Sequence, residues 1–536
     1  MILNNEGLKD RAAWEAAGYA LPGFDREAVR EKTLSSPRWI HFGAGNIFRA
    51  FQANVLQELL NSGEVDTGLL VAEGFDYEII EKLNRKTDDL SILVTLKADG
   101  SVEKTVVGSI VGSYVLDREN TEDFDALKKV FSNPSLQMAS FTITEKGYAL
   151  AGPDGKTFPA IEQDFLAGPE KASSYLGKVV SLLYARFESG EKPIALVSMD
   201  NCSHNGDKVY AAVNGFASAW AKNGLVPEAF VKYVNDPEKV SYPWSMIDKI
   251  TPRPNAVVTE ILEKDGVEGL DLIETGKHTF LSEFVNAEEA QYLVIQDWFP
   301  NGKLPLDKAG IIYTDRETVD KIEKMKVCTC LNPVHTSLAV YGCLLGYDLI
   351  AAEMKDELLK KLAWRVGETE GLPVVVDPGI IRPEDFLHEV LTKRIPNPFM
   401  PDTPQRIATD TSQKLPIRFG ETIKAYRAAD PAKIDELVAV PLVYAGWLRY
   451  LLGIDDEGNA FDPSPDPMLD YAKEQMKDVH MGETDGLEEK IRPLLSNRTI
   501  FGVDLVEAGL ADRVTAYLAE MLEGEGAVRK TLEKYL

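Results

Sequence analysis

The stretch that most constrains the fold is "RWIHFGAGNIFRAFQANVLQELLNSG", residues 38–63. A short apolar run leads into Gly43-x-Gly45, and a segment with helical periodicity follows. Glycines at such a junction let the backbone turn tightly and approach a pyrophosphate, while the helix start offers free N–H groups and a positive dipole. The third glycine of the common fingerprint is replaced by Phe48 or Arg49. The stretch therefore predicts strand, turn and helix, with a dinucleotide site as one interpretation and a ligand-free turn as the other.

The dinucleotide interpretation assigns contacts to the turn and to an acid further along. The predicted contacts from the turn are Gly43, Gly45, Asn46, Phe48 and Arg49, the last through a charge-assisted bond to phosphate. A carboxylate at the end of the second strand, "GLLVA", would bond the ribose hydroxyls and repel a 2′-phosphate. Asp76, with Glu73 close behind, therefore predicts NAD rather than NADP, and a solvated loop acid is the alternative.

The pattern of apolar and polar residues changes twice along the chain. Residues 38 to about 200 alternate short apolar runs with amphipathic stretches, which predicts a parallel sheet with crossover helices. Within this region, "SILVTLKADGSVEKTVVGSIVGSYVL" has two β-rich runs around "ADGS" and predicts an inserted hairpin. Residues 240–315 mix proline-rich loops with expected short strands, "AVVTEIL", "QYLVIQD" and "AGIIYTD".

After residue 315 helical periodicity dominates, with one buried helix expected over "SLAVYGCLLGYDLIAAEM" and "PVVVD" as the main strand-like run. We therefore predict an α/β Rossmann-type N-terminal domain with an inserted β-hairpin over residues 1–314. A mainly α-helical C-terminal domain is predicted over residues 315–536.

The formal net charge of −27 argues against broad attraction to nucleic acid or anionic membranes, although a local cluster of Arg and Lys can still hold an anionic small molecule. No apolar run approaches the ~18 residues of a membrane span, and the N-terminus lacks the pattern of a secretory signal. Four cysteines in so long a chain cannot form a disulfide framework, so we expect a reducing compartment, the cytoplasm by default.

A second chemical stretch is "KMKVCTCLNPVHTS", Lys324–Ser337. Cys328, Cys330 and His335 raise the alternatives of a zinc site or a redox pair. C-x-C spacing points the two sulfurs apart, and no CxxC or HExxH partner stands elsewhere. We expect no metal, and we expect the cysteines to act as small buried hydrophobes.

Six motifs occur in a fixed order: "GAGNIFRAFQ", "TITEKGY", "SMDNCSHNG", "MIDKITP", "LNPVHT" and "RIATDTSQK". In this order they resemble the polyol-specific long-chain dehydrogenases, a family that includes mannitol 2-dehydrogenase, fructuronate reductase and tagaturonate reductase. The resemblance covers residues 38 to at least 420. It implies a Rossmann-type domain, a mainly helical domain, a site in the cleft between them, and metal-independent hydride transfer in which a lysine handles the alcohol proton.

Roles carried over from the resemblance fall on named positions. Lys326 is implied to be the general acid/base, and Asn201 and Asn332 to hold the reacting oxygen. His335 is implied to contact a substrate hydroxyl. The remaining implied contacts are Asp248, Arg406 and Lys414 to substrate and Glu145 to cofactor. Neutral amides suit a developing oxyanion, and a lysine can serve as acid/base where burial and nearby cations lower its pKa from about 10.4.

One spacing departs from the family pattern of Lys, four residues, Asn, because Lys326 stands one residue further from Asn332. On a regular helix nine residues would place Lys326 and His335 ~180° apart, whereas eight would leave ~80°. Pro333 disfavours a regular helix at this point. We predict a π-bulge or kink between Lys326 and Asn332, with Lys324 as the fallback base.

The substrate class is suggested by further cations in the region from residue 377 to 420, namely Arg382, Lys393, Arg394 and Arg418. They favour a sugar acid, although a solvated cationic face is the alternative. The predicted reaction is NADH-dependent reduction of a ketouronate, D-fructuronate to D-mannonate, with mannitol 2-dehydrogenase or tagaturonate reductase as the enzyme alternatives. A dinucleotide-binding sensor without activity is the non-enzyme alternative. The predicted partner is a small sugar acid or polyol, with no nucleic acid or membrane, and the oligomeric state is not predicted.

Overall fold

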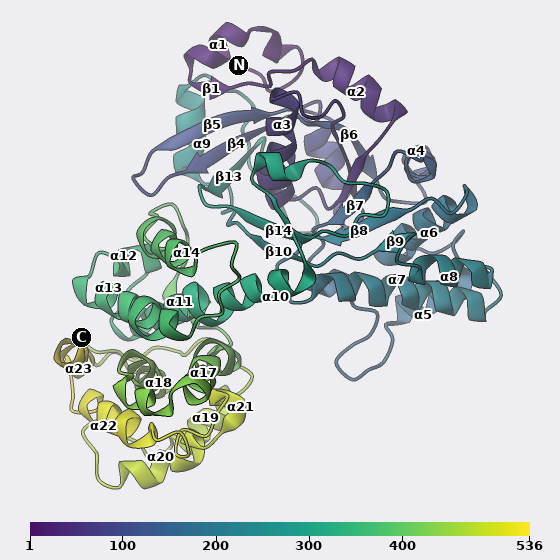
Figure 1. Cartoon of the computed structure of the whole chain (residues 1–536). Helices are drawn as coiled ribbons and strands as arrows, with labels where there is room; N and C mark the ends of the chain where they lie inside the picture. Colours follow the sequence, from purple (N-terminus) through teal and green to yellow (C-terminus); the bar gives the residue numbers. More distant parts are fainter. The chain divides into compact units, whose positions relative to one another are not determined.

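The computed structural model describes residues 1–536, which form two compact units (Figure 1). The first unit contains residues 1–97 and 101–320, and the second contains residues 321–536 together with residues 98–100. The first unit thus ends close to residue 314, where the change of texture placed the domain boundary. No helix combines the length and the apolar character needed to cross a bilayer.

The centre of the first unit is a six-stranded parallel sheet. Its central strands are apolar runs buried on both faces, as expected for a parallel sheet covered by helices. The apolar runs "RWIHF", "GLLVA", "MASFTI" and "IALVSM", which the sequence pattern predicts as strands, form four of its strands. In spatial order the strands are β6 (Ile110–Val115), β3 (Leu69–Glu73), β2 (Trp39–Phe42), β7 (Met138–Phe141), β8 (Ile194–Ser198) and β9 (Val240–Ser241).

Helices follow the strands and bury their apolar faces against the sheet. Figure 1 shows α6, α7 and α8 beside the β8 and β9 end of the sheet. The core they enclose includes Trp39, Phe42, Phe131 and Trp220. The helices of this unit are α1 (Arg11–Ala16), α2 (Arg26–Ser35), α3 (Ala53–Asn61), α4 (Thr121–Ser132), α5 (Pro159–Ala167), α6 (Tyr175–Glu188), α7 (Asn205–Lys222), α8 (Glu228–Asn235) and α9 (Ala256–Lys264).

The inserted hairpin is confirmed. β4 (Ser91–Leu96) and β5 (Val102–Val107) pair antiparallel around the "ADGS" turn. They belong to a second sheet with order β1-β5-β4-β13, in which β1 spans Tyr19–Ala20 and β13 spans Phe284–Glu288. The run that follows them, β6, leaves the hairpin and becomes the edge strand of the main sheet, parallel to β3.

Two of the three strands expected between residues 240 and 315 are confirmed. β14 (Tyr292–Gln296) and β15 (Ile312–Thr314) pair with each other, and β14 also pairs with β10 (Ser245–Asp248), in a three-stranded sheet. β11 (Ile273–Glu274) and β12 (Phe280–Leu281) form a small hairpin.

The third expected strand, "AVVTEIL", is wrong, because it forms helix α9. Asn255 caps this helix, since its side-chain oxygen accepts a hydrogen bond from the Val258 N–H at 3.0 Å. The buried side chains Val258 and Leu262 stand four residues apart, which is the helical and not the strand period.

The second unit is helical, as predicted. α10 (Arg316–Met325) leads into it. The other helices are α11 (Asn332–Leu344), α12 (Ile350–Glu353), α13 (Glu357–Trp364), α14 (Pro383–Glu389), α15 (Pro404–Ala408), α16 (Thr411–Leu415), α17 (Glu421–Ala429), α18 (Ala439–Tyr450), α19 (Leu469–Gln475), α20 (Leu487–Leu495), α21 (Arg498–Phe501), α22 (Ala511–Met521) and α23 (Ala527–Tyr535).

Two local expectations in this unit are wrong. The single helix over "SLAVYGCLLGYDLIAAEM" is divided into α11 and α12, because Gly346 has a φ of 75° and ends α11. The Tyr347 N–H then donates to the Gly342 carbonyl at 2.9 Å, which is the bond of a Schellman cap. "PVVVD" forms no strand. It begins as a 3₁₀ turn over Leu372–Val374 and pairs with no neighbouring strand, so its β-branched residues find no sheet to join.

Candidate functional site

The glycine turn lies at the carboxyl end of β2 and has the geometry of a cradle. Gly43 has a φ of 108°, and a Cβ there would overlap the Thr142 carbonyl, so only glycine fits. Gly45 is different, because no atom lies within 4 Å of the place a Cβ would occupy. The open space beside Gly45 is therefore where a pyrophosphate could approach the backbone.

The position of the missing third glycine carries a bulge. Phe48–Gln52 forms a π-helical turn between the glycine turn and α3. Phe48 is fully buried and its ring stacks on His41 with centroids 4.2 Å apart. Burial lowers the pKa of His41 to about 3, so this ring is neutral. Its two nitrogens are hydrogen-bonded to the hydroxyls of Ser140 and Thr142.

Arg49 is buried inside this turn, and burial lowers its pKa to about 10. Its guanidinium donates to the carbonyls of Ser282 at 3.0 Å and Phe284 at 3.3 Å, and to the Asn46 side chain at 3.4 Å. The arginine thus ties the turn to β13. Contacts of Arg49 and Asn46 with a phosphate remain predictions.

The two candidate acids after β3 have different roles. Glu73 accepts the Ala44 N–H at 2.9 Å through one oxygen and the Phe75 N–H at 2.8 Å through the other. Burial raises the pKa of Glu73, and these amide bonds offset part of the rise. Glu73 therefore stabilises the glycine turn through these hydrogen bonds. Asp76 accepts the Thr275 hydroxyl at 2.6 Å and is the acid that lines a pocket.

That pocket has a volume of about 520 Å³ and lies directly after β3. Its lining includes Phe75, Asp76, Tyr175, Lys178 and Lys277. The Tyr175 hydroxyl is buried and has no hydrogen-bond partner, and Lys277 lies over the Phe75 ring at 5.1 Å. An exposed aromatic ring, an acid and an orphaned hydroxyl at the end of the second strand suit an adenosine.

A half-buried acid, Asp200, connects the strand ends beside Asn201. Asp200 accepts the N–H groups of Ile143 at 3.0 Å and Thr144 at 2.9 Å and the Tyr148 hydroxyl at 2.6 Å. It therefore holds the "TITEKGY" turn beside the end of β8. Asn201 follows on the exposed turn, and burial raises the Asp200 pKa.

The other predicted site residues of the first unit lie on regular secondary structure. Glu145 begins the 3₁₀ turn Glu145–Tyr148, and its carboxylate pairs with Lys208 at 2.9 Å. Asp248 is the last residue of β10 and is buried. The cofactor contact of Glu145 and the substrate contact of Asp248 remain predictions.

The predicted bulge between Lys326 and Asn332 is confirmed. Lys326–Cys330 forms the π-helical turn η6, in which the Leu331 N–H donates to the Lys326 carbonyl at 3.1 Å across five residues. The His335 N–H then donates to the Leu331 carbonyl at 3.0 Å, so the α-helical spacing resumes. Because the bulge absorbs one residue, Lys326 and His335 return to the ~80° relation of an eight-residue step. Lys326 is 2% exposed, whereas Lys324, the fallback base, is exposed.

Charged groups from α15 and the residues just before it lie near the start of α11. His335 Nε2 lies 3.3 Å from a carboxylate oxygen of Asp402, whose other oxygen pairs with Arg406. Burial alone would raise the Asp402 pKa, but the His335 and Arg406 interactions outweigh it and hold that pKa below its usual value. The negative charge of Asp402 thus orients His335 and partly neutralises Arg406.

Two further cations lie at the same end of this unit. Arg418 donates to the Asn332 carbonyl at 3.3 Å and to the Thr336 hydroxyl, and burial lowers its pKa to about 10. Lys414 donates to the Ile407 carbonyl at 2.8 Å. Burial, with the nearby Arg418 charge, lowers the Lys414 pKa to about 8.

Of the cysteines of this stretch, Cys328 is half-buried and Cys330 is buried, and Cys343 of α11 is buried too. Burial raises the pKa of the Cys330 and Cys343 thiols to about 12. This confirms the expected role as buried hydrophobes for these two. No group of three or more His, Cys, Asp or Glu side chains is placed to hold a metal ion.

Comparison with known proteins accounts for both halves of this arrangement. Residues 37–308 match the mannitol dehydrogenase Rossmann domain, and residues 318–522 match the mannitol dehydrogenase C-terminal domain. The chain belongs to the mannitol dehydrogenase family. It is accordingly an oxidoreductase that acts on CH–OH groups.

Relatives within the mannitol dehydrogenase family span the whole chain. A D-mannonate oxidoreductase of Thermotoga maritima is 51% identical over 536 residues, covering 100% of this chain and 99% of the relative. A mannitol 2-dehydrogenase of Cereibacter sphaeroides is 29% identical over 454 residues, 83% of this chain and 85% of the relative.

Solved structures share the mannitol dehydrogenase fold. A substrate-free D-sorbitol dehydrogenase has a TM-score of 0.80 at 24% identity, covering 99% of this chain and 100% of that one. The Pseudomonas fluorescens mannitol 2-dehydrogenase, a ternary complex with NAD and D-mannitol, has a TM-score of 0.69 at 24% identity, covering 100% of this chain and 99% of that one.

The sequence did not predict three residues that organise the candidate site through their contacts. Asp200 stands beside the predicted Asn201, and Asp402 stands four residues before the predicted Arg406. Arg418 was predicted only as part of a cationic region. The helical i, i+4 spacing of Asp402 and Arg406 was a signal in the sequence, whereas the bonds of Asp200 and Arg418 join distant segments and left none.

Proposed function

We propose that the protein is an NAD-dependent, metal-independent reductase of a ketouronate, converting D-fructuronate to D-mannonate. The observation that carries the chemical part is the buried amine of Lys326, brought by the η6 bulge into register with His335 at the start of α11. The substrate part is supported by the Thermotoga maritima relative, which is named D-mannonate oxidoreductase and matches this chain from end to end.

NAD is the proposed cofactor because the first unit has residues that fit it. The backbone at Gly45 faces open space that a pyrophosphate can fill, and Asp76 lines the pocket where an adenosine would lie. An acid at that position bonds the ribose hydroxyls and disfavours a 2′-phosphate. When bound, the nicotinamide supplies a hydride to the carbonyl carbon in reduction and accepts it in oxidation.

The protein's own groups handle the oxygen and its proton. In reduction, the Lys326 ammonium donates a proton to the carbonyl oxygen as that oxygen becomes an alcohol, and the amine takes it back in the reverse direction. The side-chain amides of Asn332 and Asn201 donate hydrogen bonds to the developing oxyanion. His335, oriented by Asp402, bonds a neighbouring hydroxyl of the substrate.

The cations of the second unit supply the preference for an acid. Arg406 and Lys414 are the proposed partners of the substrate carboxylate or hydroxyls, as is Asp248 for a hydroxyl. A competing proposal, a mannitol 2-dehydrogenase, is favoured by the pairing of Arg406 with Asp402, because a neutralised guanidinium suits hydroxyls as well as a carboxylate. Relatives named mannitol 2-dehydrogenase also match this chain.

The test is a turnover assay of the purified full-length protein. NADH and then NADPH are offered with D-fructuronate, D-tagaturonate and D-fructose, and the proposal expects the highest kcat/KM for NADH with D-fructuronate. Preference for D-fructose would support the mannitol 2-dehydrogenase instead. If the cofactor binds but is not oxidised with any of the three sugar substrates, the protein is a dinucleotide sensor.

A variant pair tests the proposed base. Lys326→Ala is expected to lower kcat by roughly 10²–10⁴-fold, the range typical of general acid–base catalysis. Lys324→Ala removes an exposed lysine two residues away and is expected to leave kcat unchanged. Most of the turnover remaining in Lys326→Ala, or inhibition by EDTA, would refute the metal-independent lysine mechanism.

A further inference from the structure

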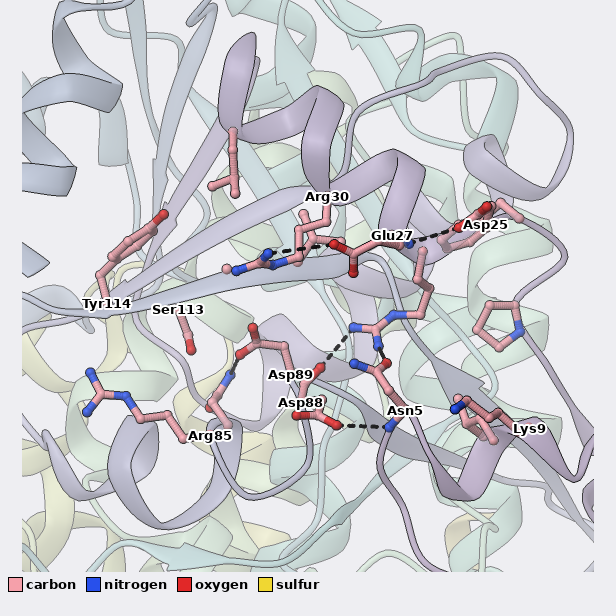
Figure 2. Close-up of a pocket in the computed structure, with 18 of the residues that line it drawn as sticks. Asn5, Lys9, Asp25, Glu27, Arg30, Arg85, Asp88, Asp89, Ser113 and Tyr114 are labelled. Atoms are coloured by element: carbon pink, nitrogen blue, oxygen red, sulfur yellow. Dashed lines mark hydrogen bonds and ion pairs between the residues drawn. The ribbon is translucent and has the colours of Figure 1, made fainter.

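The first unit contains a second cavity, of about 760 Å³, that shares no lining residue with the pocket of Asp76 (Figure 2). It lies beside the edge strand β6, between the N-terminal segment with α2 and the turn that follows the π-helical turn Ile80–Asn84. A volume of this size is typical of small-molecule sites. Nothing in the reaction proposed above uses it.

Whether a charged side chain of the lining is available to a ligand depends on the partners that it already has in the protein. Five basic and four acidic side chains line the cavity. Asp25 caps α2 and accepts the N–H groups of Glu27 and Ala28. Asp88 accepts the Asn5 N–H at 2.9 Å. Two of the acids are therefore occupied by the protein's own amides.

Of the five basic groups, Lys9 and Arg11 pair with acids outside the cavity lining, one arginine is structural, and two arginines have spare donors. Arg26 donates to three backbone carbonyls around the cavity and holds its wall together. Arg30 comes no closer than 4.0 Å to its acidic neighbour Glu27. Arg85 uses one nitrogen on Asp123 at 2.9 Å and is about half exposed. Arg30 and Arg85 thus retain N–H groups for an anion.

The inner part of the cavity includes hydrogen-bond groups and the carboxyl of Asp89. Asn84 is 3% exposed and donates to Asp89 at 3.2 Å, while its own side-chain oxygen is buried and has no partner. Burial raises the pKa of Asp89, although bonds from Ser113 and Asn84 and the charge of Arg30 oppose the rise. Burial also raises the pKa of Tyr114, so its hydroxyl stays protonated.

Figure 2 shows Ser113 between the side chains of Arg30 and Arg85 in that view, with Tyr114 to one side. Arg30, Asp89 and Tyr114 all line this one cavity.

We propose that this cavity binds a small polyhydroxylated anion, a sugar acid or a sugar phosphate, at a site separate from the dinucleotide cradle. Arg30 and Arg85 hold the acid group, and Ser113 and Asp89 accept ligand hydroxyls. The proposal does not depend on which substrate the enzyme reduces.

The test is calorimetric titration of the full-length protein with D-gluconate, ribose 5-phosphate, inorganic phosphate and neutral D-glucitol. The wild type is expected to bind D-gluconate or ribose 5-phosphate at one equivalent that the double variant Arg30→Ala/Arg85→Ala binds about tenfold or more weakly. Lys9→Ala is the matched control, because Lys9 lines the same cavity but already pairs with Glu6. All variants are expected to keep the wild-type kcat.

Hydrogen exchange localises the binding independently of stoichiometry. The amides of residues 84–89 and 111–114 are expected to gain protection with the preferred anion in the wild type and in Lys9→Ala, and to gain none in the double variant. Which anion binds more tightly identifies the sugar acid or the sugar phosphate as the source. Equal affinity of the double variant, equally tight binding of inorganic phosphate or D-glucitol, or no protection in these segments would overturn the proposal.

Discussion

Glu353 provides a sharp test of the physical reasoning, because its carboxyl is buried without compensation. It ends α12, is 0% exposed, and neither of its oxygens has a hydrogen-bond partner. It packs against Gly342 of α11, where a Cβ would overlap the carboxyl. Burial, and to a lesser degree the charge of Asp356, raises the pKa of Glu353 well above its ordinary value.

The sign of the pH dependence follows from linkage. Below the ordinary carboxyl pKa of about 4.3 the folded and unfolded chains both carry the proton. Above it the unfolded chain ionises first, so the free energy of unfolding falls by about 1.4 kcal/mol per pH unit until the raised pKa of the folded state is reached. Glutamine cannot titrate. The stability difference between Glu353→Gln and the wild type should therefore widen by about 1.4 kcal/mol for each pH unit above the ordinary carboxyl pKa, until the raised pKa of the folded state is reached.

The assay is denaturant unfolding at half-unit steps of pH, followed by circular dichroism of the helical signal. Glu357→Gln, an exposed carboxyl at the start of α13, is the matched control, and its stability curve should run parallel to that of the wild type. A difference for Glu353→Gln that stays constant across the pH range would refute the assignment of a buried, protonated carboxyl.

Four other outcomes follow from the geometry. Gly45→Ala should weaken NAD binding, measured by quenching of tryptophan fluorescence, by about tenfold or more without changing Tm, because its Cβ fills only the open cradle. Gly43→Ala should instead lower Tm, since its φ of 108° and the overlap strain the fold itself. Asp402→Asn should lower the KM for D-fructuronate relative to D-fructose in steady-state assays, because Arg406 regains its full charge; an unchanged ratio would contradict this. Cys330, whose thiol pKa is raised to about 12, should resist iodoacetamide at about pH 8 until urea is added, as mass spectrometry would show.

Features that depend on neighbouring residues can be predicted from the amino-acid sequence. The strand, glycine turn and helix at residues 38–63 follow from local pattern, and so does the hairpin around "ADGS". The bulge at Lys326–Cys330 was inferred from a one-residue excess in spacing, and the structure forms it where Pro333 already disfavours a regular helix.

Short apolar runs were the weakest part of the prediction. "AVVTEIL" and "PVVVD" have strand-like composition, yet one is a capped helix and the other finds no partner strand. β-propensity expresses fit to a sheet that must exist nearby, and composition cannot supply the sheet. The break at Gly346 was missed because apolar residues continue on both sides of it.

Motifs in a fixed order were enough to indicate the family, and residues close together in the chain were enough to predict most of the elements, the glycine turn and the bulge that begins at Lys326. The folded chain was needed to show that Glu73 braces the cradle while Asp76 lines the pocket, and that Asp402 holds His335 and Arg406. It was also needed to find the Asn84 oxygen without a partner. Hydrogen bonding and burial depend on which distant segments meet, and a linear pattern of residues does not record those meetings.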